Sequence, residues 1–177
     1  MTELEVKAGE SVRKQFVIDR EKAIDDVNRT VRFVITTGAV DRDNDTVSPG
    51  GWDTSEFMLN PTILWAHDYS QLPVARAMDI TSPPRGLEST AKFPEKGVYP
   101  FADTVFDLIK GGFLNATSVG FRPIEYTMDE ARGGLNFLRQ SLLEFSIVPV
   151  PANPEALIVA RSKGIDIQPL LDWADKT

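Results

Sequence analysis

A hydroxyl, an imidazole and a carboxylate are the side chains of this sequence that could together catalyse acyl transfer. His67 is the only histidine of the chain and follows the apolar run ILWA. A base at the end of a strand is held rigidly while its ring stays reachable. Ser118 lies in the run TSVGF. Because a serine hydroxyl is a weak nucleophile without a base, Ser118 is a candidate nucleophile only if it lies beside His67.

The third member of such a site must orient the imidazole and offset its positive charge. Glu144 lies inside the apolar run SLLEFSIVPV, where an ionised carboxylate is costly without a partner. The alternative is that strand alternation points Glu144 at solvent. Asp68 is a rival because it adjoins His67, although successive strand residues point to opposite faces.

Oxyanion donors are expected in the proline-rich segment that follows the Glu144 strand. Prolines stiffen the run PVPANP, and the backbone N–H groups of Ala152 and Asn153 could face a developing oxyanion. The alternative for this segment is a rigid turn.

His67 and Ser118 also have alternatives without a catalytic role. His67 alone could be a surface or half-buried histidine, and Ser118 alone could be a polar residue on the solvent face of a strand.

Strands must position most of these residues. Residues 29–37 alternate apolar and polar side chains with β-branched residues, which predicts a strand. Similar reasoning predicts the elements listed here in chain order: strands at 14–19, 62–67, 74–81, 86–93, 115–126, one long or two short strands at 135–150, and a short strand or helix at 156–160. Residues 74–81 and 86–93 should pair as a hairpin. Helices are expected at 53–59, 100–110 and 167–174, and a loop at 127–134. The fold class is therefore mainly β with helices (α+β), mostly antiparallel.

Composition limits the classes of function. The 177-residue chain has a net charge of −7, which argues against nucleic-acid binding and against binding to anionic membranes. It has no cysteine, which excludes disulfides and thiolate chemistry. With a single histidine, zinc motifs that need two histidines are absent as well. No metal or cofactor is expected.

An acidic loop is the remaining candidate for a ligand site. Asp41, Asp43 and Asp45 resemble the start of a calcium loop, but Thr46 and Trp52 occupy the positions where such a loop needs glycine and a bidentate glutamate. We interpret the loop as an acidic connection, with a calcium module as an alternative.

Three phrases in this order resemble the tailed-phage prohead (capsid-maturation) serine protease family, whose fold is similar to that of herpesvirus assemblin. They are ILWAHD (63–68), GGFLNATSVGF (111–121) and LLEFSIVPVPANPEA (142–156). The earlier stretch from Asp41 to Trp52, with its PGGW, also fits. The resemblance covers residues 29–160.

The resemblance implies a serine endopeptidase that cleaves capsid and scaffold proteins inside the assembling prohead, in the host cytoplasm. It matches His67 and Ser118 to the family's base and nucleophile. At the family's spacing, the third member falls on Glu144, where the herpesvirus enzymes have a second histidine. It also points to Ala152 or Asn153 for the oxyanion site.

The resemblance further implies a β-barrel-like core of the herpesvirus-protease type and allows for a homodimer. We expect a lead-in and first strand at 1–28, the protease domain at 29–162, and a tail or short helix at 163–177. The alternative function is a non-catalytic, β-rich head structural or scaffold-binding module of the same fold.

Overall fold

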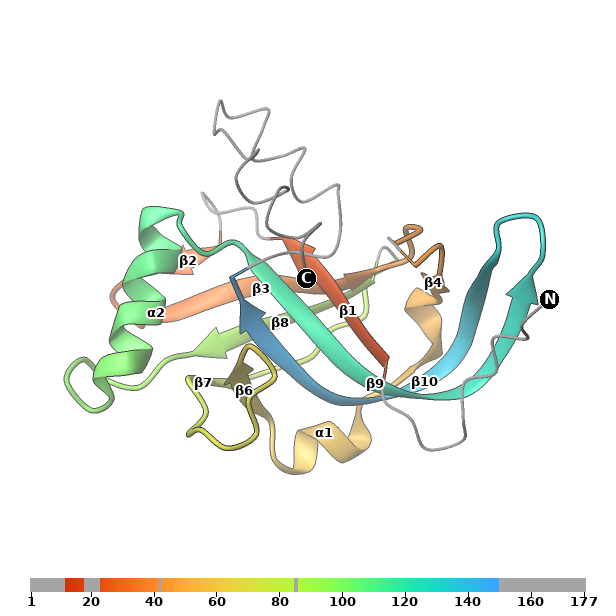
Figure 1. The fold of residues 1–177 in the computed structure, drawn as a ribbon. Helices are drawn as coiled ribbons and strands as arrows, with labels where there is room; N and C mark the ends of the chain where they lie inside the picture. The colour runs from red at the N-terminus through yellow and green to blue at the C-terminus, as the bar shows by residue number, and fades with distance from the viewer. Residues whose placement is uncertain (1–11, 18–22, 42, 85, 150–177) are drawn as a thin grey trace.

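The computed structural model describes residues 12–17, 23–41, 43–84 and 86–149, and for residues 12–17 only the backbone. Within these ranges the chain forms one mixed sheet of ten strands with short helical segments (Figure 1). In chain order the elements are β1 (Val12–Val17), β2 (Ile24–Asp25), β3 (Thr30–Thr37), β4 (Thr46–Val47), the 3-10 helix η2 (Pro49–Gly51), β5 (Trp52–Asp53), α1 (Ser55–Leu59), β6 (Thr62–Trp65), β7 (Ala75–Ala77), β8 (Gly86–Lys92), α2 (Pro100–Gly111), β9 (Ala116–Asp129) and β10 (Gly134–Val148).

The sheet is mostly antiparallel, which confirms the expected fold class. Its strand order is β1-β9-β10-β6-β7-β8-β3-β2, and β4 and β5 pair with β10 outside this path. The parallel pairings all involve β10, which runs beside β4, β5 and β6. Strand β10 is therefore the centre of the sheet and contacts segments from both halves of the chain.

The barrel-like closure implied by the family resemblance is not confirmed. The ladder of the described strands starts at β1, ends at the two-residue β2 and does not close. The sheet nevertheless curls. Strands β9 and β3, which are not neighbours in the strand order, come close enough for the Thr117 hydroxyl to donate to the Val34 carbonyl over 3.3 Å. The two halves of the sheet thus face each other across the core.

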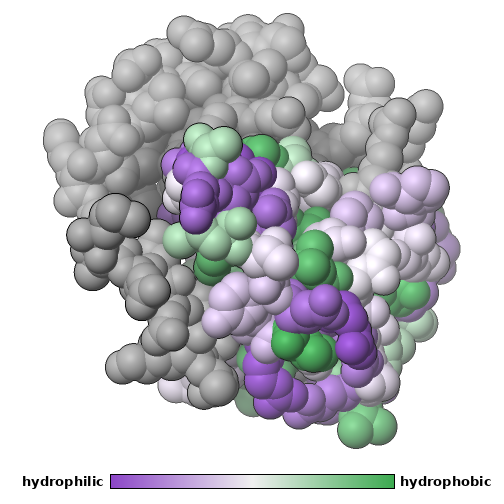
Figure 2. Space-filling view, turned by 90° about the vertical axis from the view of Figure 1, so that its right-hand side faces the viewer, coloured by the Kyte–Doolittle hydropathy of each residue, from purple (hydrophilic) through white to green (hydrophobic). Residues whose placement is uncertain are grey.

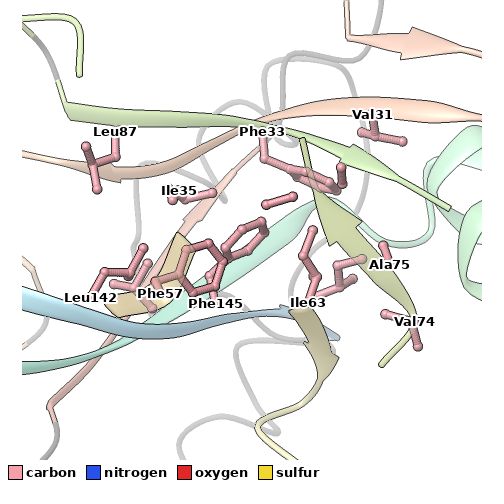
Figure 3. Close-up of a cluster of buried hydrophobic side chains, with 14 of the residues drawn as sticks. Val31, Phe33, Ile35, Phe57, Ile63, Val74, Ala75, Leu87, Leu142 and Phe145 are labelled. Carbon is pink, nitrogen blue, oxygen red and sulfur yellow. The ribbon is translucent and has the colours of Figure 1, made fainter. Parts of the chain in front are cut away.

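Aliphatic and aromatic side chains together fill the space between these halves (Figure 3). Phe145 of β10 is fully buried, and its ring lies 6.4 Å from Phe33 of β3 and 5.9 Å from Phe57 of α1, centroid to centroid. Val31, Phe33 and Ile35 are all fully buried, which confirms the alternating pattern predicted for this strand. Burial of such side chains stabilises the fold by about 1.5–3 kcal/mol each.

Helix α2 closes one end of the core and matches the predicted helix. Pro100 occupies its first turn, and Gly112 ends it in the left-handed conformation with φ of 84°. Arg29, just before β3, donates to Asp103 of α2 over 2.6 Å and to the Pro94 carbonyl over 2.7 Å. This largely buried ion pair fixes the helix against the sheet.

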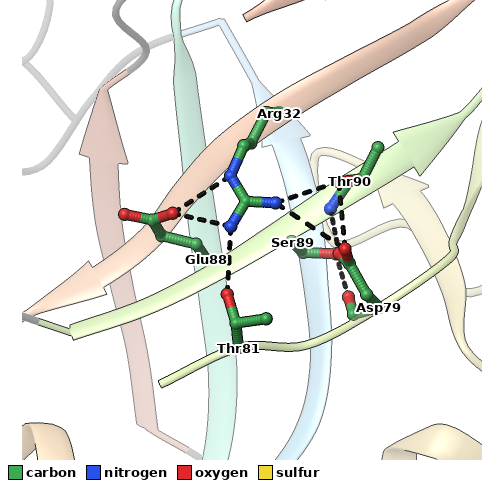
Figure 4. A network of polar contacts seen from close by, with 6 residues as sticks. All are labelled: Arg32, Asp79, Thr81, Glu88, Ser89 and Thr90. Carbon is green, nitrogen blue, oxygen red and sulfur yellow. Dashed lines mark hydrogen bonds and ion pairs between the residues drawn. The ribbon is translucent and has the colours of Figure 1, made fainter. Parts of the chain in front are cut away.

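The predicted hairpin forms between β7 and β8, which pair antiparallel. Strand β7 is shorter than expected, because regular pairing with β8 ends at Ala77. Beyond it, backbone hydrogen bonds from Met78 to Thr90 and between Thr81 and Glu88 continue the contact with β8, and side chains add to them (Figure 4). There the guanidinium of Arg32 donates to Glu88 over 2.8 Å and to the Thr81 hydroxyl over 3.1 Å. Asp79 accepts the backbone N–H of Thr90 over 2.6 Å.

Strands β9 and β10 form a long hairpin where the sequence suggested a loop at residues 127–134. Strand β9 continues to Asp129, and β10 resumes at Gly134. The stretch at 135–150 is thus one long strand as far as Val148.

The face on the right-hand side of Figure 1 mixes hydrophilic and hydrophobic side chains in small areas over the described residues (Figure 2).

The elements expected at residues 156–160 and 167–174 lie outside the described residues. Among the helices that the structure describes, none combines the length and the apolar content needed to cross a membrane.

Candidate active site

His67 lies in a tight turn rather than at the end of a strand. Strand β6 ends at Trp65, and both Ala66 and His67 have left-handed backbones, with φ of 48° and 61°. Such conformations are uncommon outside glycine. Backbone hydrogen bonds hold the turn: Ala66 N donates to the Ile147 carbonyl over 2.9 Å, and Asp68 N donates to the Trp65 carbonyl over 2.8 Å. The turn redirects the imidazole, so the strand predicted at 62–67 was two residues too long.

Strands β9 and β10 place the other two candidates on one face of the sheet. Ser118 of β9 lies opposite Ser146 of β10, and Gly120 lies opposite Glu144. Directly opposed residues of an antiparallel pair point to the same face, as do residues two apart along a strand. Ser118 and Glu144 therefore share a face. Phe145, which follows Glu144 on β10, points the opposite way, into the core.

A β-bulge aims Glu144 at this face. Leu142 pairs with Phe121, but Glu144 pairs with Gly120, so Leu143 is an extra residue on β10. Leu142 and Phe121 are both fully buried in the core. With regular alternation Glu144 would share the face of Leu142, inside the apolar core. The bulge therefore turns the Glu144 carboxylate away from the apolar core, where it would lack a partner, and toward His67.

The three side chains meet in one hydrogen-bonded sequence. His67 Nε2 lies 2.7 Å from Ser118 Oγ, and His67 Nδ1 lies 2.6 Å from Glu144 Oε1. Both distances are those of good hydrogen bonds. The side chains of His67 and Glu144 are 11% and 5% exposed, and Ser118 is fully buried. Water therefore competes little for these hydrogen bonds.

Gly120 leaves the space that the Glu144 carboxylate occupies. A Cβ atom at Gly120 would lie 2.5 Å from Glu144 Oε1, the same oxygen that contacts His67, and 3.2 Å from the Glu144 Cδ. The missing side chain at Gly120 therefore makes room for the carboxylate that contacts the imidazole.

Gly120→Ala should lower the rate of the site's reaction by roughly 100-fold, because the carboxylate must move from the imidazole and small misplacements have effects of that size. The measurement is the rate at which a serine-directed fluorophosphonate modifies Ser118, with thermal unfolding to confirm folding. Gly50→Ala is the matched control, since a Cβ there meets nothing within 4 Å. Equal rates for the wild type and Gly120→Ala would contradict this account of the glycine.

Asp68, the rival for the third position, faces other partners. Its Oδ1 accepts from the Ser70 hydroxyl over 2.6 Å and from the Ser70 N–H over 2.9 Å, and its Oδ2 accepts from Gln71. These hydrogen bonds, led by the Ser70 hydroxyl, lower the pKa of the Asp68 carboxyl. The side chain that lies against His67 Nδ1 is that of Glu144.

Two further sequence candidates are the expected oxyanion donors and the acidic loop. Ala152 and Asn153, the expected oxyanion donors, lie outside the described residues. The carboxylate oxygens of Asp41, Asp43 and Asp45 lie within 4.8 Å of one another. Asp41 accepts the N–H groups of Asp43 and Asp45, and Asp45 accepts the N–H of Leu135. These contacts tie the acidic loop to the start of β10.

Sequence reasoning missed Ser146, which contacts both His67 and Glu144. It lies two residues after Glu144, which on a strand means the same face. That spacing was the available signal.

A serine hydroxyl, an imidazole and a carboxylate in this order have the geometry of a serine hydrolase site. In fold, the chain is similar to the bacteriophage T4 capsid assembly protease, with a TM-score of 0.61, 11% sequence identity, and coverage of 80% of this chain and 98% of that one. At that identity the likeness concerns the fold alone.

Sequence comparisons define the family. Residues 25–168 match the model of the caudovirus prohead serine protease family. The chain is 32% identical over 130 residues to the prohead protease of Escherichia phage T5, covering 71% of this chain and 60% of that protein. It is 31% identical over 149 residues to the capsid polyprotein of Pseudomonas phage PAJU2, covering 82% of this chain and 22% of that protein. The chain belongs to the caudovirus prohead serine protease family.

Proposed function

We propose that this chain is a serine endopeptidase that cleaves capsid and scaffold proteins during phage head maturation, with Ser118, His67 and Glu144 as its catalytic triad. The observation that carries the proposal is the continuous contact from Ser118 Oγ through the His67 ring to Glu144 Oε1, at 2.7 and 2.6 Å. Family membership supports the reaction class.

The geometry suits each step of acyl transfer. With its proton on Nδ1, the imidazole donates to Glu144 and leaves Nε2 to accept the Ser118 proton. The Ser118 oxygen then attacks the scissile carbonyl carbon, and the carbonyl oxygen becomes an oxyanion. His67 returns the proton to the leaving amine, which leaves an acyl-enzyme that water hydrolyses. Glu144 stabilises the imidazolium, and we assign the oxyanion contacts to the N–H groups of Ala152 and Asn153.

Burial of Ser118 sets a condition on this reaction. The residue has no exposed surface in this structure, so a scissile carbonyl reaches its oxygen only when the surroundings open. Once it is bound, the carbonyl lies in a site from which water is largely excluded, where hydrogen-bond donors stabilise developing charge strongly.

The names of the relatives support the substrate class and the place of action. One relative is called a prohead protease and another a capsid polyprotein. The chain spans 60% and 22% of these two proteins. We infer that the substrates here are the major capsid protein and a scaffold protein, and that cleavage takes place inside the assembling prohead. A homodimer remains part of the proposal.

The limits of the catalytic domain and its relation to herpesvirus proteases belong to the same proposal. We assign the protease domain to residues 29–162, with 1–28 and 163–177 as flanking segments. The family match at 25–168 supports this division. The curled, mostly antiparallel sheet with its nucleophile and carboxylate on adjacent strands supports a herpesvirus-protease-like core.

A serine-directed fluorophosphonate tests the proposal directly. Incubation should add one phosphonyl group to the chain, and peptide mapping should locate it on Ser118 and on no other serine. Parallel incubation with the phage's major capsid protein should yield a shortened product. Absence of both the adduct and the product would refute the peptidase assignment and favour a non-catalytic head module of this fold.

A further inference from the structure

Ser146 contacts two members of the triad with one hydroxyl group. Its Oγ donates to Glu144 Oε2 over 2.8 Å and accepts the backbone N–H of His67 over 3.1 Å. The residue is fully buried and lies directly opposite Ser118 in the β9–β10 ladder. Among its contacts, the one with Glu144 joins two side chains of the same strand.

The chemistry of the hydroxyl allows one arrangement of these contacts. A serine hydroxyl has one proton to donate and two lone pairs to accept with, whereas an ionised carboxylate only accepts. The proton must therefore go to Glu144, which leaves a lone pair for the His67 N–H. A buried carboxylate oxygen without a donor is unfavourable, and Ser146 supplies that donor to the oxygen that His67 does not use.

The second contact acts on the backbone that carries the imidazole. Ala66 and His67 are both left-handed, and a non-glycine residue stays in that region only when its surroundings hold it there. The Ser146 hydroxyl satisfies the N–H of the second of these residues. Loss of the hydroxyl would thus loosen the carboxylate and the turn together.

We propose that Ser146 is a positioning residue of this site: it holds the Glu144 carboxylate and the His67 backbone so that the imidazole faces Ser118. The residue does not touch the reacting atoms and acts through the other two. The catalytic part of this inference rests on the proposed function.

Ser146→Ala tests the inference through the sole histidine of the chain. With ¹⁵N-labelled histidine, the Nδ1–H resonance reports the contact with Glu144 without overlap from any other imidazole. It should shift or broaden in Ser146→Ala and stay unchanged in Ser141→Ala, a matched change on the same strand at a position opposite Arg122. If the alanine variant does not fold, Ser146→Cys takes its place, because the thiol keeps a weak donor of similar size. Its histidine resonance should lie between that of the wild type and that expected after loss of the contact.

The rate of fluorophosphonate addition to Ser118 supplies the second readout. We expect Ser146→Ala to slow it roughly 10- to 100-fold, the range for loss of a hydrogen bond to a charged group. In a Glu144→Gln background the same change should have a much smaller effect, since Ser146 acts through that carboxylate.

The outcomes separate the two proposals. If the wild type forms neither the adduct nor the capsid-protein product, the proposed function fails, while the resonance still tests the contacts of Ser146. If the wild type reacts and Ser146→Ala keeps both its rate and its histidine resonance, the positioning role is overturned. An equal rate loss in Ser141→Ala would also overturn it, because the effect would then be general to the strand.

Discussion

Ser118→Ala should abolish cleavage of the major capsid protein while leaving the fold intact. The substitution removes the oxygen that lies 2.7 Å from His67 Nε2, and the proposed triad contains no other hydroxyl that could form an acyl-enzyme. Loss of a triad nucleophile lowers kcat by up to about 10⁶-fold. Co-expression of the chain with the capsid protein, followed by mass analysis of the capsid protein, measures the effect.

The fold should tolerate this change. Ser118 is fully buried, but alanine is smaller and fits the same space, so thermal unfolding should shift little. Ser141→Ala is the control, a buried serine on β10 outside the contacts among His67, Ser118 and Glu144. Normal capsid-protein cleavage by a folded Ser118→Ala variant would refute the assignment of the nucleophile.

Glu144→Gln should reduce cleavage by roughly 10³- to 10⁴-fold, the effect of neutralising the carboxylate that orients a triad histidine. The glutamine amide keeps the shape of the side chain but loses the charge that stabilises the imidazolium. If its nitrogen faces His67 Nδ1, the ring must carry its proton on Nε2 and can no longer accept the proton of Ser118. The rate of capsid-protein cleavage by the purified variant gives the size of the effect.

Asp68→Asn is the matched comparison for Glu144→Gln, since both changes neutralise a carboxylate near His67. Asp68 adjoins His67 in the sequence, whereas Glu144 contacts its ring. Asp68 is bound to Ser70 and Gln71, so we expect Asp68→Asn to keep the wild-type rate within a few-fold. A result in the opposite order, with Asp68→Asn inactive and Glu144→Gln active, would assign the third position to Asp68.

Local pattern predicted the elements whose periodicity is regular. The alternation of β3, the helix α2 and the pairing of β7 with β8 were all expected from the local residue pattern. The short strands β2, β4 and β5 were missed. Each has two residues and exists only through its pairing partner, which no local window contains.

The site was predictable in its residue types but not in its geometry. The single histidine, a serine in TSVGF and a carboxylate in an apolar run were visible in the sequence, and the family resemblance joined them. Whether Glu144 pointed at solvent or at His67 could not be decided, because the answer depends on the bulge at Leu143. A bulge depends on how two strands register against each other, which is a property of the pair.

The amino-acid sequence by itself determined the chemical groups, their order along the chain and the β-rich class of the fold, because residue type and periodicity are local properties. Only the tertiary structure decided that three distant segments meet, that Gly120 makes room for the Glu144 carboxylate and that Ser146 links it to the His67 backbone. Those outcomes depend on strand register, on a turn with two left-handed residues and on contacts between β6, β9 and β10, all of which arise only when the sheet assembles.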